Sequence, residues 1–591
     1  MAKRLGMLTM ALLLLFSLVL PHANYTHAKD KPKENQEKIA KKWVKSKVKQ
    51  MTIEEKVGQL FIVHAYGKTP TDPDYAETNI NSKRGGANFK EIIEKYHIGG
   101  VIYFNWSQNI GTPLDSSQVQ SLSNGLQKIA VNQKSNIPLF ISTDQEGGIV
   151  ARVTEPATVF PGNMALGATG SASYAKKAAE ITGSELKSLG INMDFAPDLD
   201  VNINPENPVI GVRSYSENPD LVAALGTAQV AGLQNQNVIA TGKHFPGHGD
   251  TNVDSHYGLP IINHDKKMLN EIDLKPFKAT IKSGIDAIMT AHIVVPALDK
   301  SGMPATLSKP IMTGVLRDQL GYNGLIITDS LDMSGADVLP ADQIPVAAFD
   351  AGADILLNPP DVEDAYKAML KAVKSKKIRK KRLDQSVTRI LLAKYKRGII
   401  KDPFTKNNSI KKIGLPENLK ATEEITTKSI TLIKNENHVL PLKKGKNVFV
   451  TGPASANSER LSDILLEKGL RSSDFSTSTS PTTEQIQTAV TRAQNADIIV
   501  VTTYTANTNN AQQLLVKALK QTGKPVVIAS MRNPYDIMAF PNVDANILTY
   551  GNRDISTRAL AKVLVGEVNP SGKLPITIPG LYQFGFGLQY K

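Results

Sequence analysis

The chain has 591 residues, with 69 Lys and Arg, 55 Asp and Glu, no Cys, and a formal net charge of +14. Its hydrophobic content of 41% and charged content of 21% are those of a folded globular protein, and its length indicates at least two domains. A sequence without cysteine excludes disulfides, thiolate metal sites, iron–sulfur clusters, a cysteine nucleophile and cysteine-linked lipidation.

The positive charge is concentrated in two segments. Residues 1–50 hold eleven Lys and Arg against three Asp and Glu, and residues 365–401 hold fourteen against the single Asp384. The rest of the chain carries a net charge of −7, so the body of the protein is mildly acidic. Because binding to nucleic acid requires a basic surface, we expect no nucleic-acid partner.

The first 28 residues have the layout of a secretory signal. Two basic residues at positions 3 and 4 precede an apolar run over residues 7–20, and small residues follow near position 28. The run is too short for an ordinary membrane span. We expect residues 1–28 to be a signal peptide or, if uncleaved, an N-terminal anchor, so that the protein is secreted or tethered to the membrane. Residues 29–49 are predicted to be a basic linker or a first helix.

Eight short apolar runs, rich in Val, Ile and Phe, alternate with longer amphipathic stretches. They cover residues 60–63, 101–104, 139–142, 192–196, 238–241, 287–290, 325–328 and 354–357. Runs of this length between helical segments are typical of buried parallel strands. Eight of them predict a (β/α)8 TIM-like barrel over residues 50–400.

A polar residue with useful chemistry follows each apolar run. These residues are His64, Asn105, Asp144, Asp198, Lys243 with His244, His292, Asp329 and Asn358. Catalytic residues of such barrels lie at the carboxyl ends of the strands. The strand ends therefore predict the position of an active site.

A second α/β pattern follows a linker predicted over residues 401–428. Apolar runs at residues 448–450, 497–501, 526–529 and 547–550 alternate with helical segments. This alternation predicts a smaller αβα sandwich domain over residues 429–591. Its first turn, Thr451-Gly452-Pro453, lacks the spaced glycines of a dinucleotide-binding loop, so we expect no such cofactor.

The densest polar cluster follows the fifth run. It contains Lys243, His244, His248, Asp250, Asp254 and His256, in a loop bent by Pro and Gly. The residues alone leave two interpretations open. Imidazole and carboxylate groups suit a metal such as zinc or manganese. Alternatively, Asp254 orients His256 and raises its basicity, forming a proton-transfer pair.

Carboxylates and arginines at other strand ends complete the predicted site. Asp329, after the seventh run, is positioned to attack a carbon, bind a metal or cap a helix, and we favour the nucleophile. Asp144 and Arg152 flank a segment with two glycines, and Arg213 follows the fourth run. Such groups suit a polyhydroxylated ligand, because each hydroxyl offers a donor and an acceptor. Trp106 is a candidate to stack on a sugar.

Taken together, these segments resemble glycoside hydrolase family 3, in the two-domain form. The similar segments are residues 51–60, 144–152, 191–213, 243–256, 326–333, 429–435 and 571–575. The fifth-strand loop is typical of the bacterial β-N-acetylglucosaminidase (NagZ-like) branch, a β-N-acetylhexosaminidase activity.

The resemblance implies a retaining exo-β-N-acetylglucosaminidase that forms a covalent glycosyl-Asp intermediate. In it, Asp329 is the nucleophile, His256 is the acid/base and Asp254 is the partner of His256. The remaining matched positions, which contact the sugar in the family, are Asp144, Arg152, Arg213, Lys243 and His244. The resemblance implies no metal and no cofactor.

The predicted second domain supports the assignment of His256. Family members that act as glucosidases typically supply a Glu acid/base from that domain, but residues 502–510 contain no acidic residue. A neutral imidazole does not repel an anionic acceptor as a carboxylate would. The alternative is therefore a β-N-acetylglucosaminide phosphorylase, which uses phosphate in place of water.

Together with the export signal, the resemblance implies glycan substrates that contain N-acetylglucosamine, namely peptidoglycan (muropeptide) fragments of the cell wall. A non-catalytic cell-wall-binding protein is the alternative from another class, and the presence of Asp254, His256 and Asp329 disfavours it. The basic segment at residues 365–401 is interpreted as a solvated helix, with retention on anionic cell-wall polymers as the alternative.

Overall fold

The computed structural model describes residues 31–590. The chain divides into two compact units, residues 1–49 and residues 50–591. In the first unit the described residues form helix α2 (Lys31–Gln50), and the predicted signal at residues 1–28 lies outside the described residues. Within residues 31–590, no helix combines the length and the hydrophobicity needed to cross a membrane.

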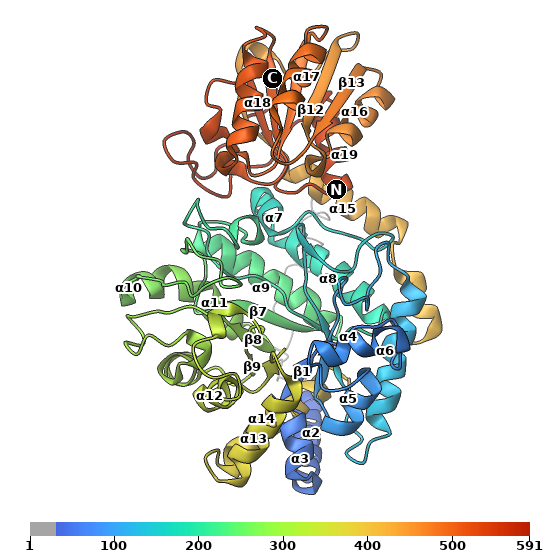
Figure 1. The fold of residues 1–591 in the computed structure, drawn as a ribbon, viewed down its shortest axis with the longest axis vertical. Coiled ribbons are helices and arrows are strands. Elements are labelled where there is room, and N and C mark those ends of the chain that lie inside the picture. The colour runs from blue at the N-terminus through green and yellow to red at the C-terminus, as the bar shows by residue number, and fades with distance from the viewer. Residues whose placement is uncertain (1–30, 591) are drawn as a thin grey trace, which may run out of the picture. The chain divides into compact units, whose positions relative to one another are not determined.

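Eight parallel strands form a barrel in the second unit (Figure 1). They are β1 (Phe61–Val63), β2 (Gly100–Ile102), β3 (Phe140–Thr143), β6 (Met193–Asp194), β7 (Ile239–Phe245), β8 (Ala287–Thr290), β9 (Leu325–Ile327) and β10 (Leu356–Leu357). The order in the sheet is β10-β1-β2-β3-β6-β7-β8-β9, and a parallel bridge between Ile327 and Ile355 joins its two ends. The predicted (β/α)8 barrel is confirmed.

Helices surround the barrel strands. They are α3 (Ile53–Gly58), α4 (Ala76–Asn81), α5 (Phe89–Tyr96), α6 (Ser116–Val131), α7 (Asn163–Thr169), α8 (Ala172–Ser188), α9 (Pro219–Asn235), α10 (Lys266–Met268), α11 (Leu274–Lys282), the π-helical η5 (Pro310–Gln319), α12 (Ile344–Ala351), α13 (Val362–Lys374) and α14 (Lys380–Lys396). Several starts follow from the sequence. Asp115, Asn218 and Asp361 accept hydrogen bonds from first-turn N–H groups of α6, α9 and α13.

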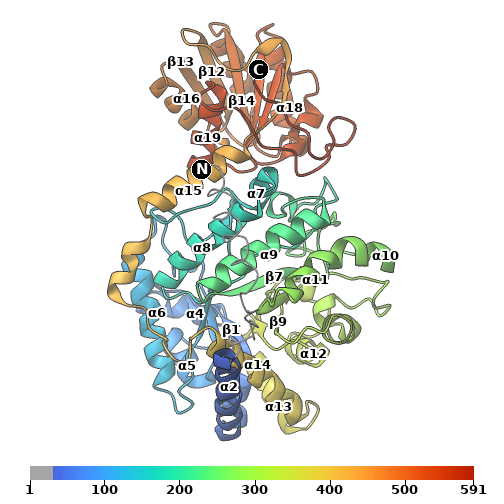
Figure 2. The ribbon, with the colours of Figure 1, turned by 180° about the vertical axis from the view of Figure 1, so that it is seen from behind.

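Helix α15 (Pro416–Ser429) lies in the segment predicted as a linker. Thr422 Oγ1 donates a hydrogen bond of 2.8 Å to Val159 O, and Ile425 packs in an apolar cluster with Phe160 and Tyr215. Both views show α7 and α15 between the barrel and the second domain (Figures 1 and 2). The segment is therefore packed against the barrel.

The second domain contains a six-stranded sheet. Its strands, in sheet order, are β11 (Thr431–Asn435), β16 (Ala545–Leu548), β15 (Val526–Ser530), β14 (Ile498–Thr503), β12 (Asn447–Pro453) and β13 (Arg471–Thr477). Only β11 pairs antiparallel. The helices are α16 (Ser458–Glu467), α17 (Thr483–Ala493), α18 (Asn510–Lys520) and α19 (Asp554–Leu564). This arrangement confirms the predicted smaller α/β domain.

Two apolar cores cover the two faces of this sheet. One joins alternate strand residues such as Phe449 and Ile499 to α17 and α18, and it includes Met164 of α7 in the barrel. The other joins neighbouring strand residues such as Val448 and Val500 to α16 and α19. Because successive strand residues point to opposite faces, one sheet supports both cores.

Polar contacts attach the second domain to the connection between β6 and α9. Ser216 Oγ donates to Pro575 O at 2.5 Å, and the Glu217 carboxylate accepts from Thr577 N and Oγ1 at 2.6 and 2.7 Å. Asn202 Nδ2 donates to the Tyr535 hydroxyl at 3.2 Å. The same connection carries Arg213, so the second domain is packed on one wall of the predicted site.

Candidate active site

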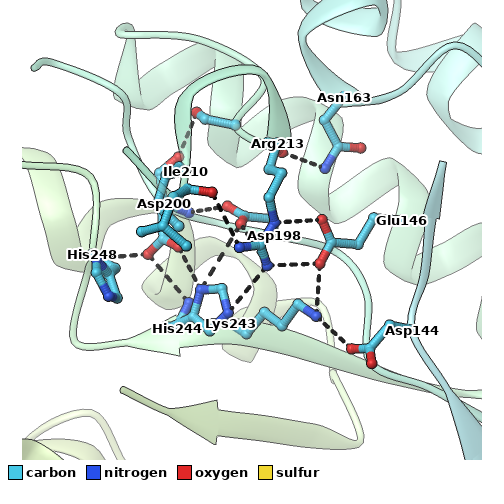
Figure 3. Close-up of polar contacts among 12 residues, drawn as sticks. Asp144, Glu146, Asn163, Asp198, Asp200, Ile210, Arg213, Lys243, His244 and His248 are labelled. Atoms are coloured by element: carbon cyan, nitrogen blue, oxygen red, sulfur yellow. Dashed lines mark hydrogen bonds and ion pairs between the residues drawn. The ribbon is translucent and has the colours of Figure 1, made fainter. Parts of the chain in front are cut away.

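Four charged groups meet at the carboxyl ends of β3, β6 and β7. Lys243 Nζ lies 2.9 Å from Asp144 Oδ1 and 2.7 Å from Glu146 Oε1 (Figure 3). Arg213 donates from Nε and Nη2 to the two oxygens of Glu146 at 2.9 and 2.8 Å. Glu146 therefore binds two cations at once, and Asp144 and the Lys243 ammonium remain at the edge of this group.

Burial makes the ion pairs of Glu146 strong. Desolvation alone would raise its pKa, but the charges of Arg213 and Lys243 outweigh it, and the pKa of Glu146 falls below its ordinary range. The same pairs raise the pKa values of Arg213 and Lys243 against their own burial. All three groups are charged, and the side chains of Glu146, Lys243 and Arg213 are at most 10% exposed.

A short hairpin positions Glu146. Strands β4 (Gln145–Gly147) and β5 (Val150–Ala151) are joined by a turn in which Gly147 and Gly148 have φ values of 89° and 57°. Only glycine adopts such angles without strain. A Cβ at Gly148 would also lie 2.9 Å from Pro161 O. The two glycines noted in the sequence are thus required by the turn that holds Glu146 in place.

Asp200 organises the histidines that follow β7. Its Oδ1 accepts from His248 N at 2.7 Å and from His244 N at 3.2 Å, and its Oδ2 lies 2.7 Å from His244 Nδ1. Asp200 is fully buried. The His244 ring is therefore oriented by its Nδ1, and its Nε2 lies 3.4 Å from Arg213 Nη2.

Asp198, Asp200 and His244 offer three ligand atoms within 4.8 Å of one another, which is the geometry of a candidate metal site. Burial, and then the neighbouring Asp200, raise the pKa of Asp198 well above its ordinary value. Arg213 Nη2 lies 3.8 Å from Asp198 Oδ2. The raised pKa of Asp198, which favours its neutral form, and the nearby guanidinium both disfavour a cation here.

Asp329 follows β9 and keeps its charge. Its N–H donates to Thr290 O at 3.2 Å, and its Oδ1 accepts from Ser330 N at 2.8 Å. Burial would raise its pKa, but His244, His292 and the Ser330 N–H lower the pKa below its ordinary value. His292 Nε2 donates to Ser330 O at 2.9 Å and so supports the residue next to the carboxylate.

The loop after β7, residues 246–258, is called the β7 loop here. In it, His256 Nδ1 lies 2.7 Å from Asp254 Oδ1, which also accepts from His256 N at 2.9 Å. The His256 side chain is 52% exposed. Gly335 N donates to Ser255 O at 3.0 Å, so the β7 loop is bonded to the connection that starts at Asp329.

Arg152 packs against aromatic side chains. Its guanidinium packs over the Phe104 ring at 5.7 Å, and Phe104 stacks on Trp106 with ring centroids 4.6 Å apart. Trp106 is 49% exposed. The predicted contact between Arg152 and a sugar stays a prediction, and the structure places the Arg152 guanidinium over an aromatic group at the strand end of β2.

Two residues of this site were not predicted from the sequence, Glu146 and Asp200. Glu146 was visible only as a carboxylate between Asp144 and two glycines. Asp200 stands two residues after Asp198, and such spacing after a strand places two side chains on one side. Both clues lie in the local sequence, whereas the residues that Glu146 and Asp200 contact come from other parts of the barrel.

Two protein-family models and a known protein match most of the chain. Residues 52–393 match the model of the Glycosyl hydrolase family 3 N terminal domain, and residues 430–590 match that of the C-terminal domain. The chain is 38% identical over 552 residues to Beta-hexosaminidase A of Pseudoalteromonas piscicida, covering 83% of this chain and 90% of that protein.

Two solved structures are similar over most of the chain. A glycoside hydrolase family 3 beta-N-acetylglucosaminidase from Paenibacillus sp. str. FPU-7 has a TM-score of 0.82 and 38% identity, covering 89% of this chain and 99% of that one. The beta-glucoside phosphorylase BglX has a TM-score of 0.78 and 25% identity, covering 92% and 97%.

Proposed function

The chain belongs to glycosyl hydrolase family 3, and we propose on that premise that it is a retaining exo-β-N-acetylglucosaminidase. A β-hexosaminidase and a β-N-acetylglucosaminidase, each 38% identical to it, support this activity. The observation that carries the proposal is the 2.7 Å contact between Asp254 and His256. It gives the barrel a candidate proton donor of its own, and the second-domain loop at residues 502–510 contains no acidic residue.

In the first step, the Asp329 carboxylate attacks the anomeric carbon as the bond to the leaving oxygen breaks. His256 gives its proton to that oxygen, and Asp254 stabilises the imidazolium beforehand. The low pKa of Asp329 keeps it ionised beneath the developing oxocarbenium ion. The products of this step are the free aglycone and a sugar esterified to Asp329.

In the second step, neutral His256 takes a proton from a water molecule as the water oxygen attacks the anomeric carbon. The ester bond to Asp329 breaks, and the carboxylate returns. Two inversions at one carbon retain its configuration. The exposed position of His256 suits this step, because both the leaving group and the incoming water arrive from solvent.

Charged side chains of the barrel bind the terminal sugar in this proposal. Asp144 and Lys243 offer an acceptor and a donor at neighbouring positions, and His244 presents Nε2. Arg213 is held by Glu146 and keeps the wall of the site charged and rigid. Arg152, whose guanidinium packs over Phe104, is proposed to contact the sugar as well.

An aryl β-N-acetylglucosaminide and the matching aryl β-glucoside test this activity directly. We expect faster hydrolysis of the first, with the β-anomer as the first product in proton NMR spectra. Release of the α-anomer would contradict a covalent intermediate. Activity that disappears with EDTA and returns with zinc would favour the metal interpretation of Asp198, Asp200 and His244.

We also propose that the natural substrates are peptidoglycan fragments and that the protein is exported. The signal-like residues 1–28 support export, and the basic segment at residues 365–401 supports association with anionic cell-wall polymers. The test is release of N-acetylglucosamine from purified muropeptides, combined with fractionation of cells. Activity confined to the cytoplasm would contradict export.

A phosphorylase is the second candidate, favoured by the use of His256 and by the similarity to a beta-glucoside phosphorylase. Here a phosphate oxygen attacks the anomeric carbon, Asp329 leaves, and N-acetylglucosamine 1-phosphate forms. Phosphorus NMR spectra of reactions in phosphate buffer would detect this product. Free sugar as the sole product would eliminate the phosphorylase.

A further inference from the structure

A basic hollow lies at the opposite end of the barrel from Asp329. It has a volume of about 650 Å³, and its cationic lining consists of Lys309, Arg317, Lys377, Arg379, Arg382 and Arg389. Asn323, which also lines it, precedes β9, whereas Asp329 follows β9. Six residues of extended chain correspond to about 20 Å, so this hollow is separate from the active site.

Three guanidinium groups of the hollow share one carboxylate. Arg317 Nη2, Arg389 Nη1 and Arg382 Nη1 lie 2.5, 3.1 and 3.5 Å from oxygens of Asp354. Asp354 is fully buried. Burial would raise its pKa, but the arginines lower it, so the carboxylate is charged. The hollow that these three arginines line also contains Asp318 and Asp350, so its lining holds six cationic side chains and two carboxylates and remains net positive.

Helix α14 begins with charges of the unfavourable sign. Arg379, Lys380, Lys381 and Arg382 occupy its start, no acidic residue stands in its first turn, and no side chain caps it. The N-terminal end of a helix is partially positive, so cations there are destabilising. The free N–H groups of such a helix end also remain available to an anion.

Helix α13, which precedes α14 in the chain (Figures 1 and 2), has the usual pattern of charges. Asp361 caps it, Glu363 and Asp364 stand in its first turn, and Lys371 and Lys374 stand in its last turn. The side-chain charges at the start of α14 are therefore opposite in sign to those at the start of α13. Charges that break a stability rule without a local compensation are expected at functional sites.

A second hollow adjoins the first. It has a volume of about 500 Å³, is lined by Lys380, Lys381 and Thr388, and shares Gln385 and Arg389 with the first hollow. Its carboxylate, Asp384, is already paired with Lys56 at 2.6 Å. Within the described part of the chain, Lys377, Arg379, Lys380 and Lys381 have no carboxylate within 4.0 Å.

We propose that the two adjoining hollows bind neighbouring phosphate groups of a linear polymer that carries a phosphate in every repeat. The donors of Arg317 and Arg382 are largely taken by Asp354 and main-chain carbonyls. Arg379, Lys380 and Lys381 are therefore the groups offered to phosphate oxygens, and the uncapped start of α14 adds N–H donors. Two neighbouring cationic hollows fit consecutive phosphates of one chain better than a single phosphate ion. The site goes beyond the hydrolytic activity, and it would hold the enzyme on a polyanion while the mouth of the barrel stays free.

Long-chain inorganic polyphosphate is the probe, with binding measured by titration calorimetry at several salt concentrations. The variant combines Arg379→Gln, Lys380→Gln and Lys381→Gln, and the matched control combines Lys411→Gln, Lys412→Gln and Lys420→Gln. Both lose three charges from exposed positions. We expect the first variant to bind about tenfold more weakly or worse, with a salt slope reduced by about 2, and the control to bind like the wild type.

Two further measurements separate binding from folding and from catalysis. Hydrolysis of an aryl substrate should be unchanged in both variants, because none of these residues lies near Asp329. The melting temperature of the first variant should be equal or higher, because cations at the start of a helix are destabilising. A lower melting temperature with normal binding would show that the cations serve stability and would overturn the proposal.

Other outcomes contradict the site or its ligand. Equal loss of binding in both triple variants would mean that only net charge matters. If inorganic phosphate competed for the site as well as polyphosphate does at equal phosphate concentration, the ligand would not be a polymer. Binding to phosphatidylglycerol vesicles that depends on Arg379 to Lys381, without binding to polyphosphate, would assign the surface to a membrane.

Discussion

The two halves of the active site are built in opposite ways. On the sugar side, Glu146, Lys243 and Arg213 are buried and linked by contacts of 2.7 to 2.9 Å. On the aglycone side, His256 is 52% exposed and its described side-chain partner is Asp254. The difference separates two tasks. In the proposed mechanism, a buried, charged wall recognises one sugar, whereas an exposed acid accepts varied leaving groups and admits water.

The exposed half is nevertheless fixed at its base. His248 and Thr251 in the β7 loop are buried, while Asn252, Val253 and His256 are exposed. His248 N donates to Asp200, and the His248 ring lies 3.0 Å from Ser255 Oγ. Only the tip of the β7 loop is therefore free of the buried network. The following substitutions test where the buried part of the site ends and the exposed part begins.

Asp329→Asn should have the largest effect. Removing the nucleophilic carboxylate prevents the covalent intermediate for any aglycone, and we expect kcat to fall by about 10⁴ or more. Steady-state kinetics with good and poor aryl leaving groups measures this. Comparable losses for both groups are expected. A variant that keeps substantial activity would show that another residue attacks the sugar.

His256→Ala should cost activity only where protonation is needed. With a poor leaving group we expect kcat/KM to fall by about 10² to 10⁴, and with an acidic phenol much less. The free energy of unfolding should stay within about 0.5 kcal/mol, because the side chain is exposed. Equal losses across leaving groups would remove His256 as the acid and would erase the contrast between the two halves.

Glu146→Gln should instead cost stability. It leaves Lys243 with Asp144 and Arg213 with the more distant Asp198 as their remaining carboxyl partners, and loss of one partner from a buried ion pair costs about 3 to 5 kcal/mol. Urea unfolding measures this, with the exposed Glu94→Gln as control. Equal stability of the two variants would mean that the charged wall is solvated. Because the pKa of Glu146 is lowered, the stabilisation should fade as pH falls below the ordinary carboxylate range.

The sequence predicts the elements that are buried on both faces. All eight barrel strands were found, because such strands have uniformly apolar sequences. Two strands of the second sheet, β11 and β13, were not predicted. Strand β13 reads Arg-Ser-Ser-Asp-Phe-Ser-Thr and lies at an edge, where it is only partly buried. Edge strands need no apolar run, so their sequence does not distinguish them from loops.

The site follows the same division. Residues at the ends of predicted strands, such as Asp329 and Lys243, were found from position alone. Glu146 was missed because its role depends on Arg213, which is 67 residues away in the chain. Arg152 is predicted to contact the sugar, and only the structure shows that its guanidinium packs over Phe104 after the β4–β5 hairpin. The direction in which a side chain points after a turn depends on tertiary contacts, which the spacing of residues in the sequence does not predict.

Asn207→Ala tests the link between the two halves. Asn207 Nδ2 donates to His248 O and Gly249 O at 2.9 and 3.0 Å, and its Oδ1 accepts from Val209 and Ile210. The amide thus joins the connection that carries Arg213 to the β7 loop, as a positioning residue. Loss of these bonds should cost about 1 to 3 kcal/mol, seen mostly as lower kcat with poor leaving groups.

The matched control is Asn204→Ala, because Asn204 contacts the β7 loop only through the side chain of Asn252. A loss of kcat/KM that is the same for good and poor leaving groups would mean that Asn207 supports the fold generally. A loss confined to poor leaving groups would place it in the positioning of the acid.

Substitution of His264 should give the smallest effect, and that effect depends on pH. Its Nδ1 lies 2.7 Å from Asp273 Oδ2, and its Nε2 lies 2.8 Å from Asp250 Oδ2 in the β7 loop. The hydrogen bond to Asp273, followed by the charges of Asp273 and Asp250, raises the pKa of His264 to about 9 against its burial. The protonated ring therefore clamps the base of the loop.

A raised pKa in the folded state stabilises the protein fully below the unfolded pKa of about 6.5, and this contribution is lost as pH rises through 9. We expect wild-type stability to fall by about 1 to 2 kcal/mol across that window, and His264→Gln to lack the change. Urea unfolding at pH 6, 7.5 and 9.5 measures this, with exposed His438→Gln as control. If His264→Gln kept the wild-type pH dependence, the charge of His264 would not hold the base of the β7 loop. The fixed part of the site would then end at the contacts of Asp200.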